Sequence, residues 1–362
     1  LGLVQALVDK RDGHHPVLPT ERIIERKRLV QHSNLNRKLG EAAAERTYIF
    51  NNLEDWAARV FEGMVFTETK SYRPAPKQAP LKRINHIIIS DPHFGSDITE
   101  AETGVCNYGR VEEARRAASI VKQGIDLAVD TDKLVVWFLG DMLENLMHSS
   151  HDGTYISEQI ARAIWILTQM ITQFALRFKI VDVECAIGNH ARLAGVQKER
   201  VMSGKWDSYE MVIYYAVKMA CKNLQNVVFH IPKTPYVIAQ VFDYRILGSH
   251  GDNFMLPGFP TKTIPTDRLI AQANSFNMSL EREARCRAFL FGHVHSYSHS
   301  NGAGVDFITN AALLPPNEFA ISIGVSPKVQ SGQCFFTSTP KEAVEVARLL
   351  KVDRATDMDA TL

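Results

Sequence analysis

The feature that most constrains the fold of this chain is a series of apolar runs that each end in a short cluster of Asp, Asn and His. Each run has the length of a buried strand. In chain order the clusters are Asp91-x-His93, Gly140-Asp141, Gly188-Asn189-His190, His250-Gly251 and Gly292-His293-x-His295. A single His or Asp after a strand has an ordinary structural explanation, but five such clusters in succession indicate one shared site.

The first cluster illustrates how two of these side chains act together. An apolar run ends at Ser90, and Asp91 and His93 follow with one residue between them. Residues i and i+2 of a strand project to the same side, so the carboxylate and the imidazole are expected to point the same way. Ligands in open α/β sheets bind at the carboxyl ends of the strands, which predicts a binding site at this edge.

The remaining pattern predicts an α/β protein. We expect strands over residues 84–90, 134–139, 180–187, 227–231, 236–241, 244–249, 288–291, 319–325 and 333–337. We expect helices over residues 110–129, 155–178, 207–222, 268–285 and 340–350. Two of the strands, 236–241 and 244–249, are separated by only two residues, which favours a hairpin.

The predicted domain organisation has three parts. Residues 1–82 form a small helical extension that ends in a linker rich in proline over 71–80, residues 83–350 form the main domain, and 351–362 form a tail. Basic residues are frequent in the extension, which would suit a DNA-binding helical module. Acidic residues are interleaved with them, which favours a surface that docks on the main domain or on another subunit, as in a homo-oligomer or larger assembly.

Composition excludes several classes of protein. The net charge of the 362 residues is +1, so attraction to nucleic acid must come from a local patch. The five cysteines are scattered without a C-x-x-C pair, which argues against a disulfide framework and a cysteine zinc site and predicts a reducing compartment. No signal pattern and no run of about 18 apolar residues occurs, so we expect no membrane association and a cytoplasmic location, the host-cell cytoplasm if the chain is phage-encoded.

The ordered clusters resemble those of the calcineurin-like metallophosphoesterases over about residues 84–338. That resemblance implies a four-layer αββα sandwich of two mixed sheets with a two-metal site at the strand ends. It implies that one ion is held by Asp91, His93 and His295. It assigns to the other ion Asn189, His250 and His293, with Asp141 as the bridge.

The residue types suit this chemistry. Two divalent ions roughly 3.5–4 Å apart can lower the pKa of a water, which then attacks the phosphorus as hydroxide, and can hold the charge of the phosphoryl oxygens. Mixed imidazole and oxygen ligands suit manganese, iron, zinc or nickel better than calcium or magnesium. We expect manganese first among these cofactors.

His190 is the candidate for proton transfer to the leaving group, because it follows the predicted ligand Asn189 directly. In the family an acidic residue commonly follows this His, whereas this chain has Ala191-Arg192. We hypothesise that Glu144, three residues after Asp141, compensates by accepting a hydrogen bond from His190. The alternative for Glu144 is a helix cap or a solvated residue.

Three further residues are candidate substrate contacts: Arg192, Asn145 and His151. The loop over 145–154 is expected to lie over the site. A groove for DNA also needs basic walls. Its candidates are Lys198, Arg200, Lys205, Lys262, Arg268, Arg282, Arg285 and Arg287.

Several motifs more closely resemble phage-encoded metallophosphoesterases of the DNA-repair-exonuclease-like type. They are Gly140-Asp141-x-x-Glu144-Asn145, Gly188-Asn189-His190-x-Arg192, Lys205-Trp206-Asp207, His250-Gly251-Asp252, and Gly292-His293-x-His295 followed by Asn301-Gly302. This resemblance favours a phosphodiesterase or nuclease acting on DNA. Two alternatives stay open: a phosphodiesterase or phosphatase for a small substrate, and a structural or assembly protein that retains the metal site.

Overall fold

A computed structural model describes residues 81–104, 107–128, 132–144, 155–192, 208–252, 266–317, 321, 326 and 329–352. Apart from residues 81 and 82, the predicted N-terminal extension and its linker lie outside these residues, as do most of the predicted tail and the loop over 145–154.

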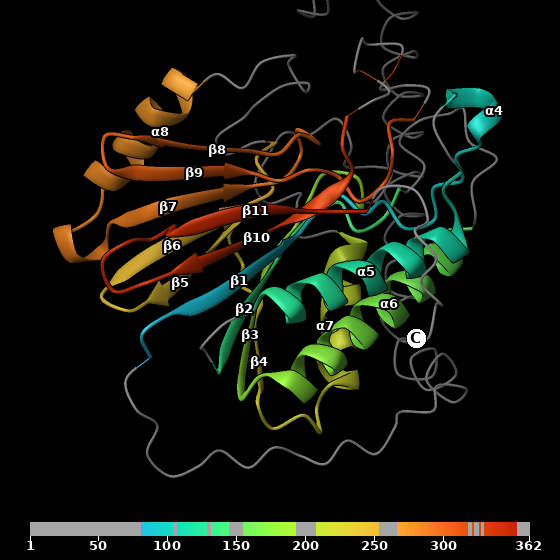
Figure 1. Cartoon of the computed structure of the whole chain (residues 1–362), viewed down its shortest axis with the longest axis horizontal. Helices are drawn as coiled ribbons and strands as arrows, with labels where there is room; N and C mark the ends of the chain where they lie inside the picture. The colour runs from blue at the N-terminus through green and yellow to red at the C-terminus, as the bar shows by residue number, and fades with distance from the viewer. Residues whose placement is uncertain are drawn as a thin grey trace, which may run out of the picture. The chain divides into compact units, whose positions relative to one another are not determined.

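One mixed sheet has six strands in the order β11-β10-β1-β2-β3-β4 (Figure 1). Its parallel half is formed by β1 (Ile84–Ile89), β2 (Lys133–Leu139), β3 (Ile180–Ala186) and β4 (Val227–His230). Its antiparallel half adds β10 (Gly332–Ser338) and β11 (Val346–Lys351). Every residue of β1 is buried, as expected for a strand at the centre of a covered sheet.

The second mixed sheet has five strands in the order β5-β6-β7-β9-β8. The predicted hairpin is confirmed and consists of β5 (Tyr236–Val241) and β6 (Tyr244–Ser249). Parallel to β6 run β7 (Cys286–Phe291) and β9 (Val305–Thr309), and β8 (Ser298–Gly302) closes the sheet antiparallel to β9.

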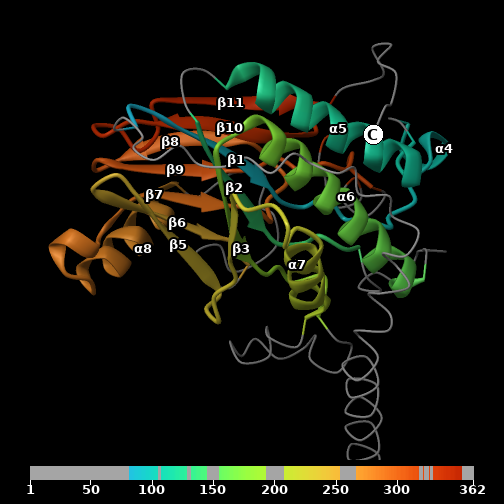
Figure 2. The same ribbon diagram turned by 90° about the horizontal axis from the view of Figure 1, so that it is seen from below.

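Helices cover the outer face of each sheet, which confirms the predicted four-layer sandwich (Figure 2). Against the six-stranded sheet lie α5 (Arg110–Leu127), α6 (Ile156–Arg177) and α7 (Tyr209–Ala220). On the five-stranded sheet lies α8 (Thr266–Met278), which buries Leu269 and Ala273 against Phe289 and Phe307. The described residues also include two short helices, α4 (Glu100–Thr103) and η2 (Arg282–Ala284).

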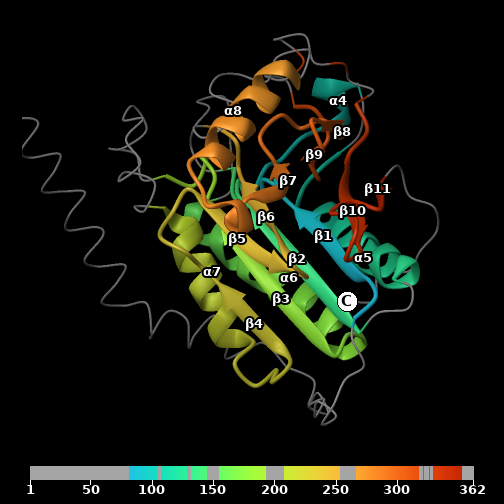
Figure 3. The same ribbon diagram turned by 90° about the vertical axis from the view of Figure 1, so that its left-hand side faces the viewer.

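The inner faces of the two sheets pack on each other around Trp137, which is fully buried with Val237, Ile246 and Leu290. Contact is close: a Cβ atom on Gly248 would come within 2.8 Å of the Trp137 side chain. At one side of the sandwich β4 forms the edge of the six-stranded sheet beside α7 (Figure 3). No helix in the described part of the chain has the length and apolarity to cross a bilayer.

The predicted helix over 340–350 is wrong. Residues Val346–Lys351 form β11, which pairs antiparallel with β10 in a register that sets Cys334 opposite Leu349. Ala, Leu and Arg favour a helix locally, but exposed and less exposed side chains alternate along this segment as in an edge strand. Pairing with β10 therefore outweighs the local helical preference.

The hairpin of β8 and β9 was not predicted, because β8 (Ser298–Gly302) contains no large apolar residue. Its turn has positive φ at both central residues, Ala303 (54°) and Gly304 (78°), as a type I′ turn requires. The predicted strand over 319–325 lies outside the described residues apart from Ile321. The amide of Ile321 donates to the carbonyl of Asn317, which is a helical hydrogen bond.

Candidate metal centre

The polar clusters that follow β1, β2, β3, β6 and β7 meet at one edge of the sandwich. Main-chain hydrogen bonds tie the first two loops together: the amide of Asp91 donates to Gly140 O at 3.0 Å and that of His93 to Asp141 O at 3.1 Å. The loops after β2 and β3 approach so closely that a Cβ on Gly140 would lie 2.4 Å from Gly188 N. This closeness explains the glycine before Asp141 and the one before Asn189.

The backbone of these loops adopts an unusual conformation. Within the described residues, seven non-glycine residues have positive φ, and five of them are predicted metal ligands. Those five are Asp91, His93, Asp141, His293 and His295, with φ between 49° and 69°. Non-glycine residues rarely adopt this left-handed region, and such strain concentrates at functional sites. The strain supports a functional interpretation of the clusters.

Three predicted ligands of one ion converge. The Nε2 atoms of His93 and His295 lie 3.2 Å apart, and His295 Nε2 is 3.3 Å from Asp91 Oδ1. Asp91 and His93 are buried, while the side chain of His295 is 35% exposed. The group therefore opens to solvent on the side of His295.

The predicted ligands of the other ion form a second group. His250 Nε2 lies 3.0 Å from both Asp141 Oδ2 and Asn189 Oδ1. The ring of His293 lies 5.0 Å from that of His250 between centroids, and its coordinating atoms cluster with those of Asp141 and His250 within 4.8 Å. The other carboxylate oxygen of Asp141 accepts hydrogen bonds from the amides of Asn189 (2.7 Å) and His190 (2.8 Å). That arrangement leaves Oδ2 directed at the group.

The residues around these two groups fit metal ions. The second ring nitrogen of His250 lies 2.8 Å from Leu139 O, and Nδ1 of His93 lies 2.9 Å from Glu144 Oε2. Metal-ligating histidines characteristically donate this second N–H to a carbonyl or a carboxylate, which directs the lone pair of Nε2 at the ion. The donor set of imidazole nitrogen with carboxylate and amide oxygen is that of a transition-metal site.

Charge around the second group is arranged to favour a cation. Burial would raise the pKa of Asp141, but the positive charges of His250 and His190 hold that pKa well below its usual value. Burial would lower the pKa of His250, but Asp141 beside it raises that pKa to about 10. In the first group, burial and the nearby His190 lower the pKa of His93, which favours the neutral imidazole with a lone pair for a metal ion.

His190 lies between the two groups with a side chain that is 13% exposed. Its ring is 4.4 Å from that of His93, and its Nε2 atom is 4.0 Å from Asp141 Oδ2. Its Nδ1 atom lies 3.0 Å from the main-chain carbonyl of Glu144. The hypothesis assigns this role to the Glu144 carboxylate, but that carboxylate lies 2.9 Å from His93 Nδ1, and His190 is held by the main-chain carbonyl of Glu144.

Of the predicted substrate contacts, only Arg192 is described; Asn145 and His151 lie outside the described residues. Arg192 is buried and donates to Asp252 Oδ2 at 2.6 Å. Among the candidate basic walls, Arg285 and Arg287 stand at the amino end of β7, whereas His293 follows its carboxyl end. About 20 Å of strand separates the two ends. Arg285 and Arg287 therefore do not line the candidate metal centre.

Three buried side chains hold these loops, and none of them is among the site residues predicted from sequence. Glu113 accepts from the amide of Gly95 at 2.7 Å, and Glu210 accepts from those of Met142 and Gly188. Gln333 accepts from Ser90 N at 2.8 Å, directly before Asp91. Of the three, only Gln333 could have been noticed in the sequence, because it is a glutamine next to the apolar residues of strand β10.

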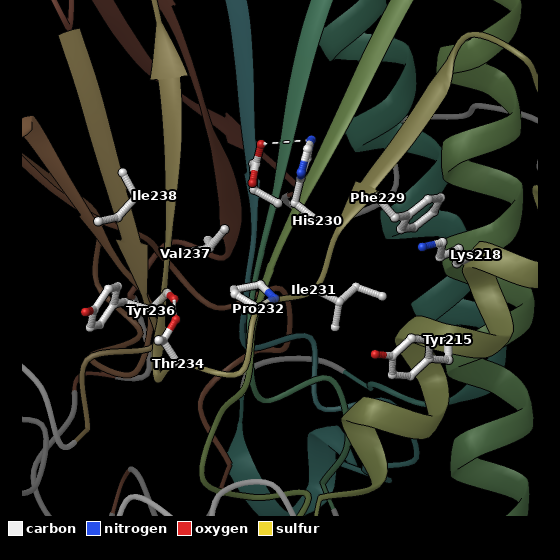
Figure 4. Close-up of a pocket in the computed structure, with 11 residues that line it drawn as sticks. Tyr215, Lys218, Phe229, His230, Ile231, Pro232, Thr234, Tyr236, Val237 and Ile238 are labelled. Atoms are coloured by element: carbon white, nitrogen blue, oxygen red, sulfur yellow. Dashed lines mark hydrogen bonds and ion pairs between the residues drawn. The ribbon is translucent and has the colours of Figure 1, made fainter. Parts of the chain in front are cut away.

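A separate groove of about 600 Å³ opens where β4 and β5 meet beside α7. Tyr215 and Lys218 lie on one side of it and Tyr236 on the other, with Pro232 between them (Figure 4). Glu184 also lines the groove, and its Oε1 atom is 3.9 Å from His230 Nε2. None of the predicted site residues lines this groove in the described part of the chain.

No family model and no curated protein matches the chain. Solved structures similar to it include an archaeal phosphodiesterase (11% identity, TM-score 0.35, 74% of this chain and 100% of that one). Others are Vps29 from Entamoeba histolytica complexed with zinc (8%, 0.31, 75% and 99%) and phosphopantetheinyl hydrolase from Mycobacterium tuberculosis (12%, 0.29, 68% and 94%). Identities this low leave the function to be inferred from the residues of this chain.

Proposed function

We propose that this chain is a metal-dependent phosphoester hydrolase with two adjacent divalent ions. One observation carries the proposal: two groups of His, Asp and Asn donors converge at one sandwich edge, with a partly exposed histidine between them. Asp91, His93 and His295 would hold one ion, and Asn189, His250 and His293 the other, with Asp141 as the bridge. Manganese is the first candidate, with iron, zinc and nickel as alternatives.

When bound, such ions supply an activated water and positive charge for the phosphoryl oxygens. The protein residues do the rest. Leu139 O and Glu144 fix the orientation of the two imidazoles. The amides of Asn189 and His190 hold Oδ1 of Asp141, so that Oδ2, 3.0 Å from His250 Nε2, would be free to bind a metal ion.

His190 is proposed to deliver a proton to the leaving oxygen. The carbonyl of Glu144 occupies its Nδ1 side, which leaves Nε2 to face the centre. The position of Nε2, 4.0 Å from Asp141 Oδ2, is next to the proposed bridge, where a phosphoryl group would bind. Proton transfer from a side chain in this position is general acid catalysis.

The proposed substrate is a phosphodiester, with DNA as the first candidate because the motifs resemble those of DNA-repair-exonuclease-like enzymes. A small phosphodiester is the second candidate. The position of Arg285 and Arg287 at the far end of β7 favours it, since these arginines do not extend a DNA track from the centre.

One assay separates these functions. The full-length protein is incubated with Mn²⁺ and, separately, single-stranded DNA, double-stranded DNA, a cyclic dinucleotide and bis-p-nitrophenyl phosphate, with Asp141→Asn as the inactive control. Digestion of DNA by the wild type alone supports the nuclease. Turnover of the two small diesters without DNA digestion supports the small-substrate enzyme. Bound metal without any hydrolysis overturns the proposal and favours a structural or assembly protein.

A further inference from the structure

Glu210 is a fully buried carboxylate in the first turn of α7. Within the described residues no Lys or Arg side chain forms an ion pair with it. Instead its two oxygens accept separate main-chain hydrogen bonds: Oε1 from Met142 N at 2.7 Å and Oε2 from Gly188 N at 2.6 Å. A buried carboxylate requires such donors, because the charged form is strongly disfavoured without them.

Both donors belong to loops that carry predicted ligands of one ion. Met142 directly follows the proposed bridge Asp141, and Gly188 directly precedes Asn189. Glu210 thus joins the end of β2 to the end of β3 through a single side chain. The start of α7 is also fixed on the second loop, because Tyr209 N donates to Ala191 O at 2.8 Å.

The two loops have almost no free space between them. A Cβ on Gly188 would lie 2.1 Å from Asp141 Oδ1. That same Asp141 oxygen accepts from the amides of Asn189 and His190. A small displacement of one loop relative to the other would therefore move Asp141 Oδ2 away from Asn189 Oδ1, and both lie 3.0 Å from His250 Nε2.

We propose that Glu210 is a positioning residue for the ion assigned to Asp141, Asn189, His250 and His293, which it serves by clamping the two loops from α7. The inference rests on the proposed function, since it concerns the same metal centre. It assigns a role to a side chain that does not touch the ion. Both hydrogen bonds to the Glu210 carboxylate come from the loops of Asp141 and Asn189. Of the residues assigned to the other ion, only the bridge Asp141 lies on a clamped loop, so the effect should be larger on the ion assigned to Asn189.

The substitution Glu210→Gln tests this asymmetry. An amide keeps one acceptor but turns the other into an NH₂ donor, which opposes the amide of Met142 or Gly188. Changes in the residues that orient metal ligands typically weaken metal binding about 10–100-fold. We expect a loss of that size for the ion assigned to Asn189, His250 and His293, and a smaller loss for the other ion, which shares only the bridge Asp141 with the clamped loops.

Mn²⁺ binding to the full-length protein is measured by calorimetry and by the EPR signal of free Mn²⁺, which give two dissociation constants without reference to activity. Asn277→Ala is the matched control. Asn277 is buried in α8, and its side chain bonds both the amide and the carbonyl of Cys286 (2.9 Å each) at the amino end of β7, away from the ligand loops. Equal weakening of both ions in Glu210→Gln, no weakening of either, or the same loss in Asn277→Ala overturns the clamp.

A second measurement covers the case in which Glu210→Gln does not fold. Glu210→Asp keeps the charge but is one methylene shorter, so it cannot reach both amides. Hydrogen exchange of peptides spanning 139–144 and 186–192 should then accelerate in Glu210→Asp and not in Asn277→Ala; unchanged exchange in Glu210→Asp overturns the clamp. A wild type that binds two ions without hydrolysis would contradict the proposed function and leave the clamp intact, whereas a wild type that binds no ion contradicts both.

Discussion

Arg192 and Asp252 form a buried ion pair in which Arg192 Nη2 lies 2.6 Å from Asp252 Oδ2. Their side chains are only 9% and 7% exposed. Arg192 follows the loop of Asn189 and His190, and Asp252 follows His250, so the pair joins two ligand loops that belong to different sheets. The ion pair shows that Arg192 helps to hold two ligand loops together, in addition to its predicted contact with substrate.

Removing one partner of this pair should be costly. Asp252→Ala leaves the Arg192 guanidinium buried without its carboxylate, and we expect a loss of about 3–5 kcal/mol in the free energy of unfolding. The measurement is urea unfolding followed by circular dichroism. Glu345→Ala is the control, because it breaks the more exposed pair with Arg83 (33% and 24% exposed) and should cost about 0–1 kcal/mol. Equal losses in both variants would contradict the buried role.

Metal removal should abolish both activity and part of the stability. Ions that bind only the folded state stabilise it by about 2.7 kcal/mol at a concentration 100 times the dissociation constant. We expect EDTA to lower the melting temperature and Mn²⁺ to restore it, and Asp141→Asn to lose most of this shift. His299→Ala, which alters a His–Asp pair on β8 and β9, should keep the full shift. A wild type whose melting temperature is insensitive to EDTA and Mn²⁺ would argue against the metal centre.

His190→Ala should affect substrates according to their leaving groups. A nucleotide leaving group needs a proton, and loss of a general acid typically lowers kcat about 10²–10⁴-fold. A p-nitrophenolate leaving group is stable without one, so bis-p-nitrophenyl phosphate should lose much less. The measurement is kcat for both diesters, with Mn²⁺ stoichiometry as the control for an intact centre. An equal loss for both substrates would exclude His190 as the acid.

The strand-end clusters could be predicted because each depends on local sequence. An apolar run sets the strand, and the polar residue directly after it must lie at the strand end. Asp91 and Asp141 could therefore be placed at one edge from sequence alone. The same logic, applied to Arg287, would have excluded it from the site, because it lies near the amino end of the strand whose carboxyl end His293 follows.

Other features depend on contacts between distant residues. The carboxylate of Glu144 lies on His93 because the residues after β1 and β2 pair through Phe94 and Leu143, which a linear pattern does not specify. Segment Val346–Lys351 becomes a strand only because β10 offers an edge. Glu210 resembles any first-turn helix glutamate until the fold brings two loops to it.

Glu184 predicts a pH dependence of stability that is independent of the metal centre. It lies in β3, lines the groove and is 4% exposed. Burial, followed by the nearby Asp182, raises its pKa from the usual 4.5 to about 8 despite the positive charge of Lys133. Between pH 4.5 and 8 the folded state therefore binds more protons than the unfolded state, so the free energy of unfolding falls as the pH rises.

Glu184→Gln removes this titration while keeping the shape of the protonated acid. At about 1.4 kcal/mol per pKa unit, the variant should exceed the wild type by on the order of 2–5 kcal/mol in the free energy of unfolding at pH 8.5. At pH 4.5 the two should be nearly equal. Urea unfolding at pH 4.5, 6.5 and 8.5 gives the difference, which isolates Glu184 from other carboxyls with raised pKa values. Asp126→Asn, at an exposed position on α5, serves as the control and should follow the wild type. A difference between Glu184→Gln and wild type that stays constant across this range would show that Glu184 is ionised in the fold throughout.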